Sequence, residues 1–370
     1  MRLRSLTLEQ FRNYSSTELL FAPEQKLHLF HGENGSGKTN LLEAIALLAL
    51  TKSCRSTNDE DMILWDATHF RVQGMVEYVD STMKMLECVF QRFPRRKAFF
   101  INGVRVSSTQ FIGSFPVIIF LPQDLSLFSG PPAIRRQFFD RVLCQVLPEY
   151  FREFLQYSKV LKQRNALLRR IAQGMLKEIE LDFWDEELAK AGSVLILARL
   201  ELLETLNVTV REELLGFGVE WENITLSWKR STSERSFDLL KKEFVQCLLH
   251  HRARDRALLY TSVGPHRDDW SCEVNGRNIA TFASRGQQRL CFLALLFLQL
   301  SYVELRCLQK PIVLLDDVFS ELDCIHQECV LRMLEGYQVF LSTVHSRDIF
   351  GGCIWSVSEG RIQAEVLPKK

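Results

Sequence analysis

The chain has 370 residues, of which 46% are hydrophobic and 25% charged, and its formal net charge is +1. This composition is that of a globular protein with room for two or three domains. It excludes a chain that is basic throughout, so any contact with nucleic acid must come from local basic patches. The ten cysteines contain no C-x-x-C pair, which argues against a zinc site and against a disulfide framework.

Neither the N-terminal segment nor the longest apolar stretch predicts contact with a membrane. Residues Met1–Leu6 alternate as in a strand and do not resemble a signal peptide. The longest apolar stretch, Leu290–Leu300, contains Gln299 and is too short to span a bilayer. We therefore expect a cytoplasmic protein with no membrane partner.

The first third of the chain is rich in predicted strands. Alternating or apolar runs predict strands over 2–8, 16–21, 26–30, 70–79, 83–93, 98–106 and 117–121. Asn102-Gly103 supplies a hairpin turn, because both residues tolerate positive φ. A buried helix is expected over 41–50, directly after a run of glycines.

Helical periodicity replaces this pattern from about residue 133 to residue 256. Apolar residues recur at three- and four-residue spacing over 134–147, 150–175, 182–215 and 237–256, with a short strand-like interruption over 218–228. Strands return over 270–274 and 277–280, and the chain then closes with helix, strand, helix and strand. We expect a discontinuous head domain over 1–132 and 257–370, and a helical arm domain over 133–256.

A phosphate-binding motif lies between the strand over 26–30 and the helix over 41–50. The pattern G-x-x-x-x-G-K-T turns backbone N–H groups and a helix N-terminus toward phosphates. Lys38 adds a charge between phosphates, and the Thr39 hydroxyl coordinates Mg²⁺. The residues expected to hold ATP here are Gly32, Glu33, Asn34, Gly35, Ser36, Gly37, Lys38 and Thr39.

The apolar run Pro311–Leu315 ends in two acids, Asp316 and Asp317. A strand apolar on both faces suits the centre of a parallel sheet, where ligands bind beyond the carboxyl ends. We expect Asp316 in the Mg²⁺ shell and Asp317 orienting or polarising the attacking water. The following Ser320–Asp323 is similar to a D-loop, or is an ordinary helix start with Ser320 as N-cap and Asp323 at N3.

The segment Ser284–Arg289 precedes the apolar helix of residues 290–300. It resembles the ABC signature L-S-G-G-Q, but it has Ala283 before the serine and Arg285 in place of a motif glycine. A serine hydroxyl, a glycine and a helix N-terminus form an anion site. The resemblance implies that Ser284, Gly286 and Gln287 of one subunit cap the ATP bound by the other.

The whole chain, in order and at the expected spacing, resembles the RecF family of ABC/SMC-like DNA-repair ATPases. The matching segments are 11–14, 32–45, 120–125, 135–140, 264–269, 284–289 and 314–323. The resemblance implies an α/β fold: an ABC/SMC-type P-loop ATPase head, with a mixed sheet and an antiparallel β subdomain, plus an inserted α-helical arm. It also implies an ATP-dependent homodimer with weak ATP hydrolysis that binds duplex, gapped or single-strand/double-strand junction DNA and, with RecO and RecR, helps load RecA.

Two further positions follow from the resemblance. Gln123 matches the Q-loop position, which contacts the metal and the γ-phosphate. Thr343 and His345 both remain candidates for the switch position at the end of the last strand.

Four basic clusters are candidate DNA contacts, because lysine and arginine meet phosphates without reading sequence. Each is equally explained as a solvated charged face. They are Arg92 with Arg95-Arg96-Lys97, Arg135-Arg136, Lys162-Arg164 with Arg169-Arg170, and Arg252-Arg254-Arg256. His266 and Arg267, beside Asp268 and Asp269, serve either in ion pairing or in contact.

Two other functions fit the phosphate-binding loop. A transport ATPase subunit is disfavoured by Arg285 and by the inserted arm. A small-molecule kinase needs an acceptor pocket and a lid but no second signature segment, and phosphoryl transfer to a metabolite would identify one.

Overall fold

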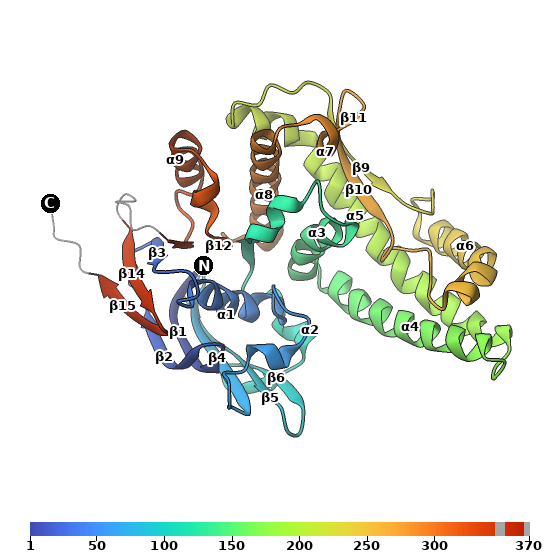
Figure 1. Ribbon diagram of the computed structural model, residues 1–370, viewed down its shortest axis with the longest axis horizontal. Helices are drawn as coiled ribbons and strands as arrows, with labels where there is room; N and C mark the ends of the chain where they lie inside the picture. The colour runs from blue at the N-terminus through green and yellow to red at the C-terminus, as the bar shows by residue number, and fades with distance from the viewer. Residues whose placement is uncertain (345–351, 366–370) are drawn as a thin grey trace. The chain divides into compact units, whose positions relative to one another are not determined.

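The computed structural model describes residues 1–344 and 352–365. The chain forms two compact units, which we describe separately (Figure 1). Unit 1 consists of Met1–Asp124 and Gln299–Lys370, and unit 2 of Leu125–Leu298.

An antiparallel sheet forms one layer of unit 1, with strand order β2-β1-β4-β5-β6-β7. Leu3, Leu6 and Leu8 of β1 are fully buried, so the apolar residues of this strand define the inner face. Asn102 and Gly103 make the β6–β7 turn, both with positive φ, as expected. The strands are β1 (Arg2–Phe11), β2 (Tyr14–Leu20), β4 (His69–Glu77), β5 (Met83–Gln91), β6 (Arg96–Ile101) and β7 (Val104–Val106).

The second sheet of unit 1 has the order β15-β14-β3-β13-β12-β8 and is parallel except for β15 at its edge. Helix α1 (Lys38–Leu50) contacts strands of both sheets, which explains why it is buried on nearly all sides. The order brings β3, β13 and β12 side by side, so their carboxyl ends share one edge. The strands are β3 (Leu27–His31), β8 (Val117–Phe120), β12 (Ile312–Asp316), β13 (Val339–Thr343), β14 (Cys353–Ser358) and β15 (Arg361–Glu365).

Unit 2 is built on long helices, as the periodicity predicted. Helix α5 (Asp182–Gly216) packs against both α4 (Pro148–Ala172) and α6 (Phe237–Leu258). Unit 2 also contains α3 (Pro132–Val146), α7 (Ile279–Phe282) and the three-stranded sheet β11-β10-β9, formed by β9 (Ile224–Lys229), β10 (Asp269–Val274) and β11 (Arg277–Asn278).

The compact unit around the helices extends further than the arm expected over 133–256. It includes 125–132 and 257–298, which were assigned to the head. The reason is the antiparallel pairing of β9 with β10 over six residue pairs, from Asp269↔Lys229 to Val274↔Ile224. A strand-like interruption of the arm therefore ties the chain after α6 to the helices, which a reading of local patterns does not reveal.

Helix α8 (Arg285–Cys307) contains the apolar stretch 290–300 and is 23 residues long. The expectation that this stretch is too short for a bilayer therefore underestimated the length of the helix. It is the one described helix with the length and composition to cross a membrane, yet 67% of its most apolar window is buried. Such burial is typical of a core helix. The short elements are α2 (Ser108–Phe111), α9 (Cys324–Met333) and four 3-10 turns, η1 (Asp59–Met62), η2 (Pro122–Ser126), η3 (Glu178–Leu181) and η4 (Val318–Glu321).

Candidate functional site

The loop between β3 and α1 requires glycine at two positions of close approach. A Cβ on Gly32 (φ 156°) would lie 2.2 Å from the carbonyl oxygen of Val357. A Cβ on Gly37 (φ 120°) would lie 2.6 Å from Nδ2 of Asn13. These two clashes explain why both positions are glycine: a side chain at either would collide with a neighbouring segment.

Lys38, the first residue of α1, turns back over the loop. Its Nζ donates to the carbonyl oxygens of Gly32 (2.7 Å) and Glu33 (2.8 Å), and the residue is only 7% exposed. Burial lowers the pKa of Lys38, and the charges of Asp317 and Asp316 oppose that shift. A buried ammonium group whose direct partners are neutral carbonyls lacks a full counter-charge, so an anion would be stabilised here.

Thr39 and Asp316 meet directly, although 277 residues separate them in the sequence. The Thr39 hydroxyl donates to Oδ1 of Asp316 at 2.9 Å, and the Ser342 hydroxyl donates to the same oxygen at 2.6 Å. Strand order explains the meeting, because Ser342 lies on β13, between β3 and β12. Hydroxyl and carboxylate oxygens are the ligands that Mg²⁺ prefers, so this donor set fits that ion. Asp317 follows in the left-handed region (φ 50°), and its N–H donates to the Ser342 hydroxyl at 3.0 Å.

A brace from the β1–β2 turn supports the loop, and it is formed by residues 11–14. Asn13 Nδ2 donates to the Ser36 carbonyl at 2.9 Å, and the Tyr14 hydroxyl donates to the Gly37 carbonyl at 3.0 Å. Arg12 forms a two-pronged ion pair with Glu43 of α1, at 2.9 and 2.8 Å. The sequence signalled this segment only through its family resemblance. Its chemical role required the fold, because 23 residues separate Asn13 from Ser36.

Gln123 lies in the 3-10 turn η2 directly after β8. Its side chain is exposed and donates to the Cys54 carbonyl at 3.3 Å. The neighbouring Asp124 is buried and accepts from the Leu121 N–H at 3.0 Å, which fixes the turn at the carboxyl end of β8. Gln123 therefore sits on the same strand-end edge as Asp316, in an accessible position.

Ser284 lies in unit 2, is exposed, and starts helix α8 with a reciprocal hydrogen-bond pair. Its hydroxyl accepts from the Gln287 N–H at 3.2 Å, and its own N–H donates to Oε1 of Gln287 at 3.0 Å. This is a capping box, and it explains why serine and glutamine stand three residues apart. Gly286 is also exposed, and a Cβ there would meet nothing closer than 3.9 Å. The signature segment is thus open to solvent at a helix N-terminus.

The expectation for Ser320 as a helix N-cap is wrong. Asp323 caps α9, its Oδ1 accepting from the His326 N–H at 2.9 Å, while the Ser320 hydroxyl donates to the Asp317 carbonyl at 2.8 Å. The 3-10 turn η4 intervenes and delays the helix start. Thr343 ends β13 and is buried, whereas His345 lies outside the described residues.

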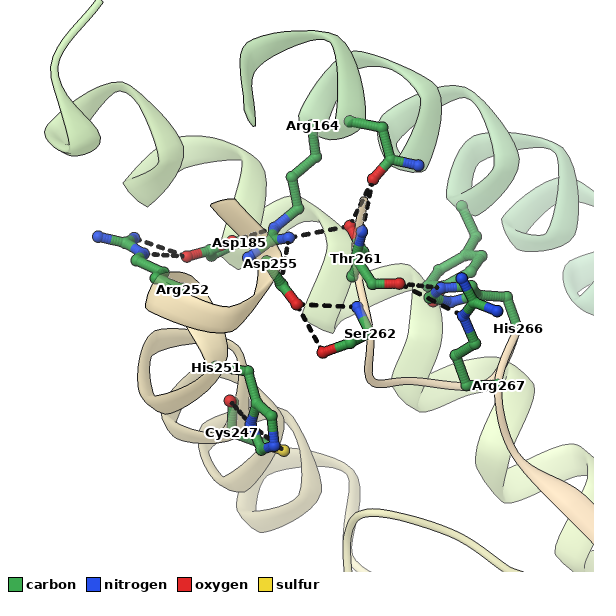
Figure 2. Close-up of polar contacts among 12 residues, drawn as sticks. Arg164, Asp185, Cys247, His251, Arg252, Asp255, Thr261, Ser262, His266 and Arg267 are labelled. Carbon is green, nitrogen blue, oxygen red and sulfur yellow. Dashed lines mark hydrogen bonds and ion pairs between the residues drawn. The ribbon is translucent and has the colours of Figure 1, made fainter. Parts of the chain in front are cut away.

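The segment 264–269 closes a buried polar network in unit 2 (Figure 2). His266 bridges the Tyr157 hydroxyl (2.6 Å) and the Thr261 carbonyl (3.0 Å), and Pro265 accepts from Arg199 at 2.6 Å. Next to it Arg164, fully buried, donates to Asp185 (2.6 Å) and Asp255 (2.7 Å). Figure 2 shows Arg164 of α4, Asp185 of α5 and Asp255 of α6 converging with Thr261 and His266 of the following loop. The segment therefore joins the helices of this unit.

Most of the candidate basic clusters are held in internal contacts. Arg92 and Arg95 lie near Glu60, and Lys97 pairs with Asp59. Arg135 forms a two-pronged pair with Asp269, and Arg136 donates to the Asp268 carbonyl. Arg252 pairs with Asp182 and Asp185, and Arg256 with Glu178. Arg267 lies over the ring of Tyr260 at 4.6 Å.

One candidate cluster differs from the others. Lys162, Arg169 and Arg170 are exposed on α4 and form no ion pair within the described residues.

The arrangement in unit 1 defines a class of protein. A glycine-rich loop and an acidic strand end meet on one edge of a largely parallel sheet, backed by an antiparallel sheet. Together with helices inserted between β8 and β12, this is the ABC/SMC-type P-loop ATPase head. A solved SMC head bound to the C-winged helix domain of ScpA has the same fold, with 14% identity, a TM-score of 0.55 and coverage of 99% of this chain and 98% of that one.

The chain belongs to the RecF family. The sequence profile "RecF/RecN/SMC N terminal domain" matches residues 2–350. A relative named DNA replication and repair protein RecF, from Enterococcus faecalis, is 36% identical over 98% of this chain and 99% of its own length. A relative of the same name from Caldanaerobacter subterraneus is 32% identical over 99% and 100%. A solved structure, described as the recombination mediator protein RecF-ATPrS in the RecFOR pathway, superposes with a TM-score of 0.90 and 31% identity, covering 99% of this chain and 98% of that one.

Proposed function

We propose that the chain is an ATP-gated DNA-binding protein of recombinational repair. The single observation that carries the proposal is the Lys38 ammonium group, buried with carbonyl partners beside the Thr39–Asp316 pair. A triphosphate with Mg²⁺ supplies the anion and the cation that these groups accept. Support also comes from the solved RecF relative described with ATP, which is 31% identical.

The residues around the loop take distinct roles in this proposal. Backbone N–H groups of 32–37 and the charge of Lys38 bind the phosphates, and Thr39, Asp316 and Gln123 hold Mg²⁺. The ion, when bound, neutralises phosphate charge and favours attack on the γ-phosphate. Asp317 would orient the attacking water, and Gln123 would contact the metal and the γ-phosphate. Hydrolysis is weak in this proposal and serves as a switch that ends the ATP-bound state.

The bound state is an ATP-dependent homodimer. Ser284, Gly286 and Gln287 are exposed at the start of α8, where a helix N-terminus attracts anions. In the dimer this segment of one subunit caps the nucleotide held by Lys38 of the other. The dimer binds duplex DNA at gaps or single-strand/double-strand junctions and, with RecO and RecR, promotes RecA loading. The relatives' name, DNA replication and repair protein RecF, supports this assignment.

The test uses two single variants, Lys38→Met and Ser284→Arg. Each alone is expected to remain monomeric by mass photometry in saturating non-hydrolysable ATP with Mg²⁺, and to bind gapped duplex no better with ATP than without it. Lys38→Met loses nucleotide affinity by about 100-fold, the effect of removing a desolvated charge contact to phosphate. Ser284→Arg retains nucleotide affinity, because its own loop is intact.

Mixing the two variants separates a shared site from one confined to a single subunit. A mixed dimer contains one complete site, with Lys38 from the Ser284→Arg subunit and Ser284 from the Lys38→Met subunit. Partial recovery of ATP-dependent dimers in the mixture is therefore expected. A wild-type chain that stays monomeric in ATP, with or without DNA, contradicts the proposal, as does equal ATP-dependent DNA binding by wild type and Lys38→Met.

A further inference from the structure

One face of helix α4 carries several exposed basic residues and no acidic residue. Five exposed basic residues occur along this 25-residue helix. At 3.6 residues per turn they fall within a wedge of about 100°, extending about 27 Å along the axis. We call this set the α4 basic face, and its residues are Arg152, Lys159, Lys162, Arg169 and Arg170.

The acids of α4 lie off this face. Glu149 and Glu153 are separated from the centre of the wedge by about 100° or more around the helix. None of the five basic residues has an ion-pair partner among the described residues. The charges of the α4 basic face are therefore free of direct ion pairs within the described residues.

The opposite face of the same helix shows what a structural arginine looks like here. Arg164 is fully buried and donates to Asp185 at 2.6 Å and to Asp255 at 2.7 Å. These contacts, with the packing of α4 against α5, fix the rotation of the helix about its axis. The backbone positions of the five basic residues are consequently fixed on the outward side of the helix.

We infer that the α4 basic face is a contact surface for the phosphate backbone of duplex DNA. The inference rests on the proposed function and assigns it a surface. Positive charge distributed along one helix face suits a polyanion with regularly repeating phosphates. The face lacks the apolar or aromatic anchors that a protein partner would need, since Leu155 is its one large apolar side chain and it is 42% exposed. The same lack disfavours insertion into a membrane surface, which requires an apolar face beside the charges.

The test compares two variants that each lose four positive charges. The first is Lys159→Gln/Lys162→Gln/Arg169→Gln/Arg170→Gln. The matched control, Lys190→Gln/Arg211→Gln/Lys242→Gln/Arg254→Gln, removes exposed charges from α5 and α6 that also form no ion pair within the part of the chain described. Binding of each protein, in ATP and Mg²⁺, to a fluorescent duplex of arbitrary sequence is measured over a range of salt concentrations.

The α4 variant is expected to bind duplex at least about 10-fold more weakly at 0.1 M salt, and its plot of log affinity against log salt should be shallower by about 3 to 4, near 0.9 per lost phosphate contact. The control variant should change the slope by less than about 1. Thermal melting and nucleotide affinity should match wild type in both, because the substituted side chains are exposed and unpaired. The four substitutions together could weaken the last turn of α4, where Arg169 and Arg170 lie. The mid-helix pair Lys159→Gln/Lys162→Gln avoids that turn and should still make the salt plot shallower by about 2.

The outcomes separate this surface from the proposed function. Wild type that binds duplex, with both variants binding equally well and with equal slopes, overturns the surface and leaves the function standing. Wild type that fails to bind duplex in ATP overturns both. Loss of binding to vesicles of anionic lipid by the α4 variant, with duplex binding intact, also overturns the inference and assigns the face to a membrane.

Discussion

Each unit contains a buried cation, Arg164 in unit 2 and Lys38 in unit 1, and the partners of these two charges are of opposite kinds. In unit 2, Arg164 is fully buried and meets two carboxylates and the Thr261 hydroxyl; only its Nη2 has no partner among the described residues. In unit 1, Lys38 is 7% exposed, but its direct partners are two carbonyl oxygens of its own loop.

The difference distinguishes a structural charge from a binding charge. A buried cation that already contacts carboxylates gains nothing from a further anion, and removing it leaves acids without compensation. A buried cation held only by carbonyls gains much from a bound anion, and its removal costs affinity more than stability. The contacts of each charge therefore indicate its role better than its burial does.

The largest expected effect on stability comes from Arg164→Met. Removal of the guanidinium leaves Asp255 buried with only hydroxyl and N–H partners, which should lower the free energy of unfolding by about 3–5 kcal/mol. Urea unfolding followed by circular dichroism, to which the helices of unit 2 contribute most, measures the loss. Nucleotide affinity of the folded protein should stay unchanged, because Lys38 and its loop lie in unit 1.

The double variant Arg164→Met/Asp255→Asn sharpens this comparison. It removes the uncompensated carboxylate, so part of the lost stability should return. If the double variant is less stable than Arg164→Met by the full cost of a second independent substitution, Arg164 and Asp255 do not act as a pair, and the contrast with Lys38 fails.

Local patterns in the sequence predicted the parts of the site that are contiguous. The spacing of Gly32, Gly37 and Lys38 and the two acids after an apolar strand each predict a group at a strand end, and the structure places both groups at one edge of the same sheet. The helical periodicity also predicts that Arg164 and Lys162 lie on different faces of the helix. Residues 162 and 164 differ by about 200° around a helix, so Arg164 could not share an exposed face with Lys162.

Contacts between distant segments were beyond such patterns. The Asn13 brace, the Ser342 hydroxyl that accompanies Asp316, and the pairing of β9 with β10 all join residues through tertiary structure. In each case the residue types alone, an amide, a hydroxyl and a half-buried strand, are common throughout the chain. Only the tertiary arrangement of the strands and sheets makes them neighbours.

Acid sensitivity should also differ between the two units. His28 in unit 1 is fully buried, and burial lowers its pKa to about 4, partly opposed by a hydrogen bond with the Gln25 backbone. As pH falls from about 6.5 toward about 4, the unfolded chain takes up a proton that the folded chain does not, so stability falls. In unit 2, burial lowers the pKa of His266 to about 4 but raises that of Asp268 to about 6. As pH falls over this range, His266 lowers the stability of the folded state and Asp268 raises it, so the two effects oppose each other.

The measurement is urea unfolding at pH 7 and pH 5. His28 should account for a loss of about 1–2 kcal/mol between these two pH values. His28→Gln should remove most of that loss, whereas His250→Gln, at an exposed position on α6, should leave it unchanged. An equal pH dependence in His28→Gln and wild type would exclude His28 as its source.

The smallest expected effect separates the loop's brace from general stability. Asn13→Ala removes the amide that donates to the Ser36 carbonyl at 2.9 Å and accepts from Asn40 at 2.9 Å, while Lys38 is untouched. Looser positioning of the loop should weaken ATP binding by about 5- to 10-fold, the equivalent of about one hydrogen bond.

Asn207→Ala is the matched control, because the Asn207 amide braces Leu226 in the same two-sided way, at 2.8 and 2.7 Å, within unit 2. Both variants should lose about 1 kcal/mol of stability, but only Asn13→Ala should lose nucleotide affinity, measured by calorimetry. Equal nucleotide affinity in the two variants would mean that the glycines and Lys38 shape the loop without help from the β1–β2 turn.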